Sequence, residues 1–293
     1  MADITSALSE TLAALHVSGK YAHISEDLLH RIATEELSKR HNTKEAIKAA
    51  KNKLHQIGGA YQGDMRYAKW LQTLTPSPPH PVTPASSLLQ PILAQHTSTR
   101  ERLPLLDTFY QRIFGLIPMP ITSILDVACG LNPLTLLWMP LPKDVRYLAC
   151  DIYGDMMDFL NQCFAQFGYA NAQAEVCDVL SAVLSPESSV LSPQSSVLSP
   201  QSLVLSSPVD VAFVLKTIPC LEQVEKTIGP KLLDVLQARY IVVSFPAQSL
   251  GGRNKNMAAN YAAHFADIIA GRPWQVQRLD FATELVFVIQ TNK

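Results

Sequence analysis

Residues 124–133 read ILDVACGLNP. An apolar run ends there in a turn of small residues, and helix-forming residues follow. Small residues let a ligand approach the backbone closely at the carboxyl edge of a sheet. One glycine near one alanine is a weak glycine-rich signal, however, and by itself this stretch fits an ordinary strand-to-helix turn equally well.

Short β-branched runs separated by helical segments surround and follow this turn. The predicted strands cover residues 123–129, 145–151, 174–177, 209–215, 240–245 and 285–290. Strands that alternate with helices indicate an α/β fold built on a doubly wound parallel sheet. Residues 276–281 closely precede the last strand, so these two runs are expected to form an antiparallel edge.

The first 120 residues have the pattern of helices instead. Residues 25–27 (SED) predict the start of a helix that runs to about residue 39, and Asn42 predicts the start of a second one that ends at Gly58-Gly59. Helical signal returns between residues 88 and 114. We therefore expect a helical domain at residues 1–105, with a Pro-rich connector at 75–87, followed by the α/β domain at 106–293.

Residues 185–191, 192–198 and 199–205 read SPESSVL, SPQSSVL and SPQSLVL. A proline in every unit excludes a continuous coiled-coil helix, despite the seven-residue period. Such low-complexity runs cannot bury a core, so we predict a surface loop within an insert at 185–208. The insert is either a regulatory docking segment or, as we favour, a repeat expansion tolerated on a loop.

The formal net charge of the 293 residues is −1, but the charges are unevenly distributed. Residues 1–120 contain 13 Lys and Arg against 10 Asp and Glu, whereas the remainder contains 11 against 15. The near-neutral total argues against a uniformly basic nucleic-acid coat protein, yet it permits a basic face on the helical domain.

Neither an export signal nor a membrane span is recognisable in the sequence. The N-terminus lacks the basic start and apolar centre of a signal peptide, and no apolar run is long enough to cross a bilayer. The five cysteines form no CxxC pair and have apolar neighbours, which favours buried reduced thiols and no metal site. A cytoplasmic protein is therefore expected.

Two acidic residues follow the next predicted strands. Asp151 ends the second strand about 20 residues beyond the turn, where a carboxylate can accept hydrogen bonds from both hydroxyls of an adenosine ribose. Asp178 follows the third strand, where a carboxylate can accept from an adenine amino group. Each could instead cap a helix, but three strand-end features in register favour a nucleoside cofactor. The turn lacks the G-x-G-x-x-G cradle expected for NAD, which favours S-adenosylmethionine because it carries no phosphate.

Several uncommon motifs occur in an order that resembles a known family. They are DVACGLNP at 126–133, HTSTRER at 96–102 with Asp107, SFP at 244–246, SLGGR at 249–253, NYAA at 260–263, His55 with GAY at 59–61, and TEL at 283–285. Together they are similar to the aminoglycoside-resistance 16S rRNA (guanine(1405)-N(7))-methyltransferases. The resemblance covers most of the chain, and the chain departs from the family in the Pro-rich connector and at 185–208.

The resemblance implies a class I S-adenosylmethionine-dependent methyltransferase domain, which is Rossmann-like, preceded by a helical RNA-docking domain. It places the following residues around the cofactor: Tyr61, His96, Thr97, Ser98, Arg102, Gly130, Asp151, Asp178, Val179, Leu215 and Gln223. Arg102 would pair with the methionine carboxylate, although a surface ion pair is the alternative for it. The implied substrate is N7 of a decoding-site guanine in 16S rRNA of the small ribosomal subunit, whose methylation gives aminoglycoside resistance. A monomer is expected.

Guanine N7 carries an exposed lone pair, so methyl transfer to it requires no general base. We therefore expect no catalytic dyad, and we expect catalysis to rest on alignment and charge stabilisation. Basic side chains are expected to contact RNA phosphates. Because the target lies deep in a folded RNA, its base is expected to flip out for methylation, and the resemblance to the family places Glu284 and Arg253 near it. The RNA-binding candidates are Lys39, Arg40, Lys44, Lys48, Lys51, Lys53, Arg253, Lys255 and Glu284. The alternatives are a methyltransferase for another RNA, a small molecule or a protein, and a catalytically silent RNA-binding relative.

Overall fold

The structure, a computed structural model, describes residues 2–40, 42–74, 85–184, 205, 207–247 and 257–293. Within these residues a seven-stranded sheet has the order β3-β2-β1-β4-β5-β7-β6. The strands are β1 (Ser123–Val127), β2 (Arg146–Asp151), β3 (Ala172–Val176), β4 (Val209–Leu215), β5 (Ala238–Pro246), β6 (Gln275–Asp280) and β7 (Glu284–Gln290). The first five pair in parallel, and β7 runs antiparallel to both β5 and β6. This sheet confirms the predicted parallel core with an antiparallel edge.

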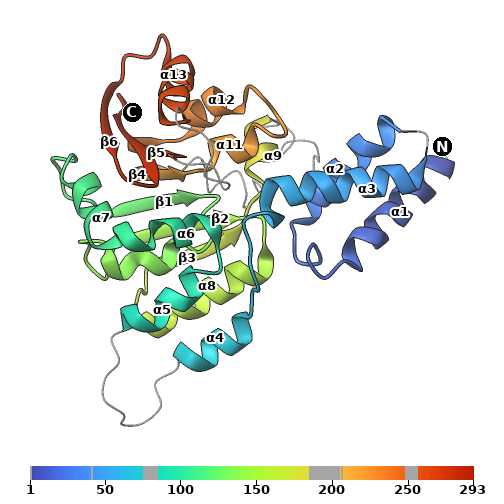
Figure 1. Cartoon of the computed structure of the whole chain (residues 1–293), viewed down its shortest axis with the longest axis horizontal. Coiled ribbons are helices and arrows are strands. Elements are labelled where there is room, and N and C mark those ends of the chain that lie inside the picture. The colour runs from blue at the N-terminus through green and yellow to red at the C-terminus, as the bar shows by residue number, and fades with distance from the viewer. Residues whose placement is uncertain (1, 41, 75–84, 185–204, 206, 248–256) are drawn as a thin grey trace, which may run out of the picture.

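Helices cover both faces of the sheet, as crossover connections between parallel strands require (Figure 1). They are α4 (Tyr67–Leu74), α5 (Ala85–Leu93), α6 (Thr97–Arg102), α7 (Leu106–Phe114), α8 (Gly154–Phe167), α9 (Val179–Leu184), α11 (Ile218–Leu221), α12 (Ile228–Val235) and α13 (Met257–Ile269). In Figure 1, α8 with α5 and α4 lies on one side of the sheet, and α12 and α13 lie on the other.

Side chains of the central strands alternate between two buried clusters, one on each face of the sheet. Ile124 of β1 and Phe213 of β4 belong to the cluster shared with α7 and α8. Their neighbours Leu125 and Val214 belong to the cluster shared with α12 and α13. Because both faces are covered, these strands are almost continuously apolar rather than alternating, which explains why they were recognisable in the sequence.

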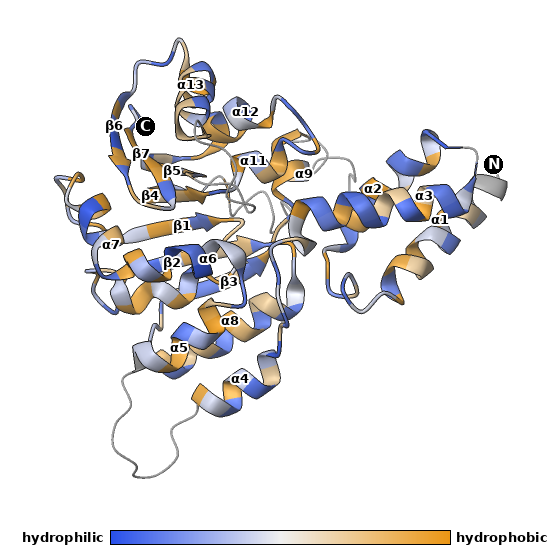
Figure 2. Ribbon diagram, in the orientation of Figure 1, coloured by the Kyte–Doolittle hydropathy of each residue, from blue (hydrophilic) through white to orange (hydrophobic). Residues whose placement is uncertain are grey.

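Helices α1 (Ala2–His16), α2 (Glu26–Ser38) and α3 (Thr43–Leu54) form a bundle beside the sheet (Figure 1). Buried residues such as Leu28 and Leu29 hold it together, while α2 and α3 carry wide hydrophilic faces (Figure 2). The side chain of Asn42 accepts a hydrogen bond from the Lys44 backbone N–H and caps α3. A π-helical turn, His55–Gly59, continues α3 to the predicted end at Gly58-Gly59.

The packing divides the chain at an earlier point than the predicted boundary at residue 105. Helix α4 packs on α8, and the rings of Tyr67 and Trp70 lie 5.0 and 5.6 Å from that of Phe159. Helices α4, α5 and α7 are short and amphipathic, and they bury their apolar sides against the sheet layer instead of against α1–α3. The helical bundle that stands apart from the sheet therefore consists of α1–α3.

Two further local predictions differ from the structure. The helical signal between 88 and 114 divides into α5, α6 and α7. The segment after the turn at 128–131 is a 3-10 helix, Asn132–Trp138, rather than an α-helix, and it begins with a proline at its second position. The Pro-rich stretch at 75–84 and the repeats at 185–204 lie outside the described residues. No helix among the described residues is both long and apolar enough to cross a membrane.

Candidate functional site

A cavity of about 320 Å³ lies at the carboxyl ends of β1, β2 and β4. This is the edge at which open α/β sheets bind ligands, because the loops after the parallel strands converge there. The predicted cofactor residues that line it are Tyr61, His96, Thr97, Ser98, Arg102, Asp151, Asp178, Val179, Leu215 and Gln223. The helical bundle also contributes to its wall, through Leu28 and through Ile57 and Gly58, which follow α3.

Gly130, in the loop after β1, connects that loop to the end of β2. Its backbone N–H donates to Oδ2 of Asp151 at 2.9 Å, and the Ile152 N–H donates to Oδ1 at 2.7 Å. The φ of Gly130 is +53°, and a β-carbon at this position would lie 2.6 Å from Cε1 of His96. Glycine is therefore required by both backbone conformation and space. Burial raises the pKa of Asp151 to about 6.

Three buried polar atoms in residues of the cavity lining lack a hydrogen-bond partner in the described structure. They are Oδ1 of Asp126, Nδ1 of His96 and the hydroxyl of Tyr153, and all three residues line the cavity. Buried polar groups in proteins are almost always hydrogen-bonded. Three partnerless ones around one cavity indicate a ligand with several polar groups.

The protonation of Asp126 and His96 is set mainly by their burial. Burial raises the pKa of Asp126 to about 7, although hydrogen bonds from Tyr147 and Asn132 oppose the shift. Burial also lowers the pKa of His96 to about 4, and the charge of Arg102 adds to this effect. His96 is therefore a neutral imidazole near pH 7.

A buried ion-pair network adjoins the cavity. Nε and Nη2 of Arg102 donate to the two carboxylate oxygens of Glu284 at 3.1 and 2.7 Å, and Nη1 donates to Oδ1 of Asn132 at 2.6 Å. The side chains of Arg102 and Glu284 are both 0% exposed. Burial raises the pKa of Glu284, but Arg102 and Lys216 outweigh it, so that pKa lies below its ordinary value.

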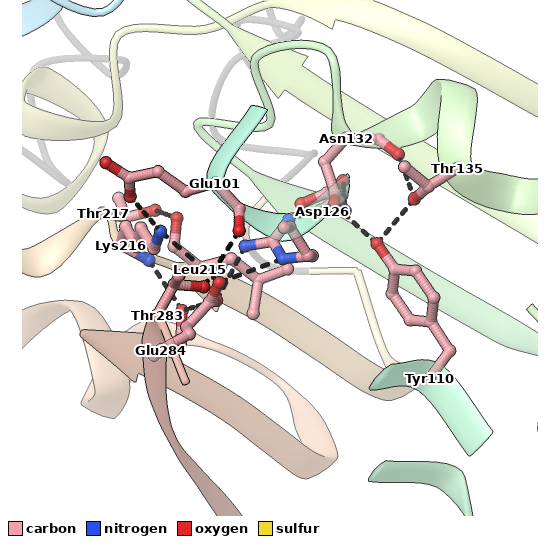
Figure 3. Close-up of polar contacts among 12 residues, drawn as sticks. Glu101, Tyr110, Asp126, Asn132, Thr135, Leu215, Lys216, Thr217, Thr283 and Glu284 are labelled. Atoms are coloured by element: carbon pink, nitrogen blue, oxygen red, sulfur yellow. Dashed lines mark hydrogen bonds and ion pairs between the residues drawn. The ribbon is translucent and has the colours of Figure 1, made fainter. Parts of the chain in front are cut away.

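Lys216 links this network to the rim of the cavity. Its Nζ lies 2.6 Å from Glu101 and 3.5 Å from Glu284, and the three side chains converge in Figure 3. Lys216 has a φ of +58°, and Ala128 has a φ of +50°. Left-handed backbone at non-glycine residues is costly and concentrates at functional sites. Both residues line the cavity, which supports its assignment as the functional site.

Comparison with known proteins agrees with this assignment. A model of the ribosomal RNA methyltransferase (FmrO) family matches residues 17–288. The chain belongs to this family. It is 32% identical over 292 residues to a 16S rRNA (guanine(1405)-N(7))-methyltransferase of Micromonospora rosea, which covers 94% of each chain. A relative of the same name from Serratia marcescens is 31% identical over 290 residues, covering 97% of this chain and 99% of the relative.

The fold of this family member is also similar to solved structures. The 16S rRNA methyltransferase RmtF, solved in complex with S-adenosyl-L-homocysteine, has a TM-score of 0.77 at 28% identity, covering 97% of this chain and 98% of that one. The 16S rRNA methylase RmtB has a TM-score of 0.72 at 26% identity over 97% of this chain and 98% of that one. These likenesses confirm the class I methyltransferase fold that the sequence motifs predicted.

The predicted RNA-binding cations occupy two different environments. Lys39 and Lys53 pair with Glu35 at 2.5 and 2.7 Å, and Arg40 pairs with Glu36, so these three charges are compensated within the bundle. By contrast, Lys44 and Lys48 are exposed, and Lys51 is half-buried on the same helix. Arg253 and Lys255 lie outside the described residues.

The predicted role of Glu284 and the predicted position of Gln223 require correction. Glu284 was expected near a flipped-out RNA base, but its side chain is fully buried, and Arg102, Lys216 and Ser244 all contact its carboxylate. A carboxylate so enclosed has no face for RNA. Its place in the TEL motif marks a residue that holds the network together. Gln223, predicted in a helix, lies in the turn after α11 and is exposed at the rim.

The sequence-based list of site residues omitted several side chains of the cavity. Asp126 lies inside the motif that identified the turn, and Lys216 follows β4, so the rule that ligands bind at strand ends could have found both. Tyr153 follows β2 and carries the same signal. Arg31, which contacts Asp178 of the lining without being part of it, carries no such signal. Arg31 is remote in sequence from every strand, and only the packing of α2 places it near Asp178.

Proposed function

We propose that this ribosomal RNA methyltransferase transfers a methyl group from S-adenosylmethionine to N7 of guanine 1405 in 16S rRNA. The observation that carries the proposal is the cavity at the strand ends. Its partnerless polar atoms, together with the carboxylate of Asp151, fit a ligand that carries amino, carboxylate and hydroxyl groups. The substrate is that of the similar 16S rRNA (guanine(1405)-N(7))-methyltransferases.

Each end of such a cofactor has suitable partners in the chain. We assign Asp151 to the ribose hydroxyls and Asp178 to the adenine amino group. Asp126, neutral His96 and Arg102 also line the cavity, and we assign them to the amino acid moiety of the cofactor. The side chain of Arg102 is 0% exposed and is bonded to Glu284 and Asn132, so we assign to it an attraction of the cofactor carboxylate through its charge and no direct hydrogen bond. Bound S-adenosylmethionine supplies an electrophilic methyl group on a sulfonium.

The residues of the cavity have no proton to remove from the substrate, since guanine N7 reacts through its lone pair. Their work is to align N7 with the methyl group and to exclude water from it. The strained backbone at Ala128 and Lys216, together with the buried network beneath them, gives the cavity the rigidity that such alignment needs.

The bundle of α1–α3 is our candidate for the surface that docks on the small ribosomal subunit. Lys44 and Lys48 are exposed on α3 and have no ion-pair partner among the described residues. Free surface cations are the groups that neutralise RNA phosphates and release counterions. We also propose that the protein acts as a monomer in the cytoplasm, where ribosomal subunits are found.

The direct test is transfer of labelled methyl groups from S-adenosylmethionine to isolated small subunits, followed by mapping of the modified base. Label at N7 of guanine 1405 supports the proposal. Subunits already methylated at that position should accept none. Label on ribosomal protein, on another nucleotide, or on free RNA alone would favour the alternative substrates, and binding of subunits without any transfer would indicate a silent relative.

The same modification should protect a bacterium that expresses the protein. Because aminoglycosides bind the decoding site, the minimum inhibitory concentration should rise when the active chain is produced. A strain that produces Asp151→Asn at an equal level is the control and should remain sensitive. Resistance in the control strain would contradict a methylation-based effect.

A further inference from the structure

Arg31 of helix α2 extends from the helical bundle to the wall of the cavity. Its Nη2 donates to Oδ2 of Asp178 at 3.0 Å and lies 3.4 Å from Oδ1, while Nε donates to Oγ of Ser181 at 3.2 Å. The side chain of Asp178 is only 2% exposed, so its charge requires a close partner. That partner is Arg31, which is separated from it by 147 residues of sequence.

The carboxylate of Asp178 is held from two sides. Within its own segment, Oδ1 accepts from the Leu180 N–H at 3.1 Å, and Oδ2 accepts from the Ser181 hydroxyl at 2.6 Å. Arg31 approaches from the bundle and is closer to Oδ2. Oδ1 thus accepts from the Leu180 N–H and, at 3.4 Å, from Arg31, which is the longest of the four hydrogen bonds to this carboxylate. Because that bond is the weakest of the four, it is the one that a donor from a ligand would replace.

Two backbone hydrogen bonds fix the position of α2 relative to the sheet. The Ser25 N–H donates to the carbonyl of Ile152 at 2.8 Å, and the Gly154 N–H donates to the carbonyl of His23 at 2.8 Å. Ser25 is the residue before α2, and residues 152–154 follow Asp151 directly. The helix that carries Arg31 therefore starts on the loop that carries the proposed ribose acid, which sets the reach of Arg31 to Asp178.

We propose that Arg31 is a positioning residue that orients Asp178 to select an amino group over an oxo group on the purine of the cofactor. The helical bundle thereby takes part in cofactor specificity as well as in docking. This inference rests on the proposed function, because it assigns the cavity to an adenosine-containing ligand. Arg31 acts through Asp178 and does not itself need to contact the ligand.

The test compares two ligands on the full-length chain by calorimetry. S-adenosyl-L-homocysteine carries an amino group on its purine, and S-inosyl-L-homocysteine carries an oxo group at the same position. Arg31→Met keeps an unbranched apolar side chain but removes the donors, and Arg31→Lys restores the charge with one donor group. Arg272→Met is the control, because Arg272 also pairs with an aspartate, Asp234, at 2.8 and 2.7 Å, away from the cavity lining.

The wild-type chain should prefer the adenosyl ligand by at least about tenfold, since leaving buried polar groups unpaired is costly. Arg31→Met should reduce that preference to less than about threefold, mainly through weaker adenosyl binding, and Arg31→Lys should recover part of it. Arg272→Met should keep the wild-type preference. An equal loss of affinity for both ligands in Arg31→Met would indicate only a structural role and would overturn the inference, as would an unchanged preference. If the wild-type chain bound neither ligand, the proposed function itself would fail.

Discussion

Gly130 is the residue at which backbone conformation and cavity shape depend on each other. An alanine there meets two obstacles: a left-handed φ, which costs about 1–2 kcal/mol, and the ring of His96 at 2.6 Å from the added β-carbon. We expect Gly130→Ala to lower the affinity for S-adenosyl-L-homocysteine at least about tenfold in calorimetry, because the ring must move within the cavity.

The matched control for this variant is Gly168→Ala. Gly168 also has a positive φ, +73°, but nothing lies within 4 Å of its added β-carbon. It should lose a similar amount of stability in denaturant unfolding and keep its ligand affinity. Equal ligand affinity in the two variants would show that the approach of His96 to Gly130 is unimportant.

Asp151 makes cofactor binding dependent on pH. Burial raises its pKa to about 6, so the carboxylate is charged above that pH and accepts hydrogen bonds, whereas below it the group is protonated. Affinity for S-adenosyl-L-homocysteine should therefore be highest above pH 7 and should fall below pH 6 by up to about tenfold per pH unit. Protonation of Asp126, with a pKa of about 7, acts in the same direction.

The variant Asp151→Asn separates the effect of protonating Asp151 from that of protonating Asp126 when ligand affinity is measured as a function of pH. It should bind weakly at all pH values and lose the component centred near pH 6. A wild-type profile that stays flat between pH 5 and 8 would contradict the raised pKa values of both carboxyl groups.

The Arg102–Glu284 pair should contribute to stability through the cost of leaving one partner alone. Glu284→Gln leaves Arg102 buried and uncompensated, and we expect it to lower the free energy of unfolding by about 3–5 kcal/mol. The double variant Arg102→Met with Glu284→Leu should lose clearly less free energy of unfolding than the sum of the losses in Arg102→Met alone and Glu284→Leu alone. Additive losses in urea unfolding would mean that the two groups are not coupled.

At the scale of elements, α3 is amphipathic in a way that serves packing and docking at once. Ala46, Ala50 and Leu54 are buried, while Lys44 and Lys48 face solvent. The ion pairs of Lys39, Arg40 and Lys53 leave Lys44 and Lys48 as the described cations of the bundle that are best placed for phosphates. Helical spacing alone could not distinguish a compensated lysine from a free one.

The paired change Lys48→Glu and Lys51→Glu should weaken binding to small subunits at least about tenfold and reduce the slope of log affinity against log salt by about 1–2. Calorimetry with S-adenosyl-L-homocysteine should show normal cofactor affinity. Lys226→Glu with Lys231→Glu, at exposed positions of the methyltransferase body, makes the same change in charge and serves as the control. A similar loss of subunit binding in both pairs would indicate a general charge effect instead of a docking face.

The central strands of the sheet were predictable from sequence because their apolar runs are buried on both faces. Strand β4 has the predicted bounds, and β2 differs by one residue at its start. The turn after β1 was recognisable, but the 3-10 helix that follows it was not, since propensity does not distinguish a 3-10 helix from a short α-helix. The assignment of α4–α7 to the sheet layer also depends on long-range packing, such as that of Trp70 on Phe159.

At the scale of the whole molecule, the bundle and the sheet share the cavity. Leu28 and Ile57 belong to the bundle side of its wall, and Arg31 of the bundle contacts Asp178 of the sheet layer. A ligand in the cavity therefore stabilises one arrangement of the bundle relative to the sheet. Because the bundle is also the proposed docking surface, cofactor and ribosomal subunit should bind with positive coupling, and linkage requires this coupling to be reciprocal.

We expect saturating S-adenosyl-L-homocysteine to strengthen binding to small subunits at least about fivefold, which is the lower range of typical coupling energies. Fluorescence anisotropy of labelled protein with and without the ligand measures this factor, and Arg31→Met should reduce it. Identical subunit affinity in the two conditions would show that the shared cavity transmits nothing to the docking surface.

The sequence by itself determined the order of the strands' apolar runs, the turn at Gly130, the acids at Asp151 and Asp178, and the family, because these are local patterns of residue type and spacing. The tertiary structure alone decided which charged side chains are free and which form ion pairs with one another. It buried Glu284 against Arg102, and it brought Arg31 to Asp178 across 147 residues. Electrostatic roles depend on distance and burial in space, and neither quantity is encoded by spacing along the chain.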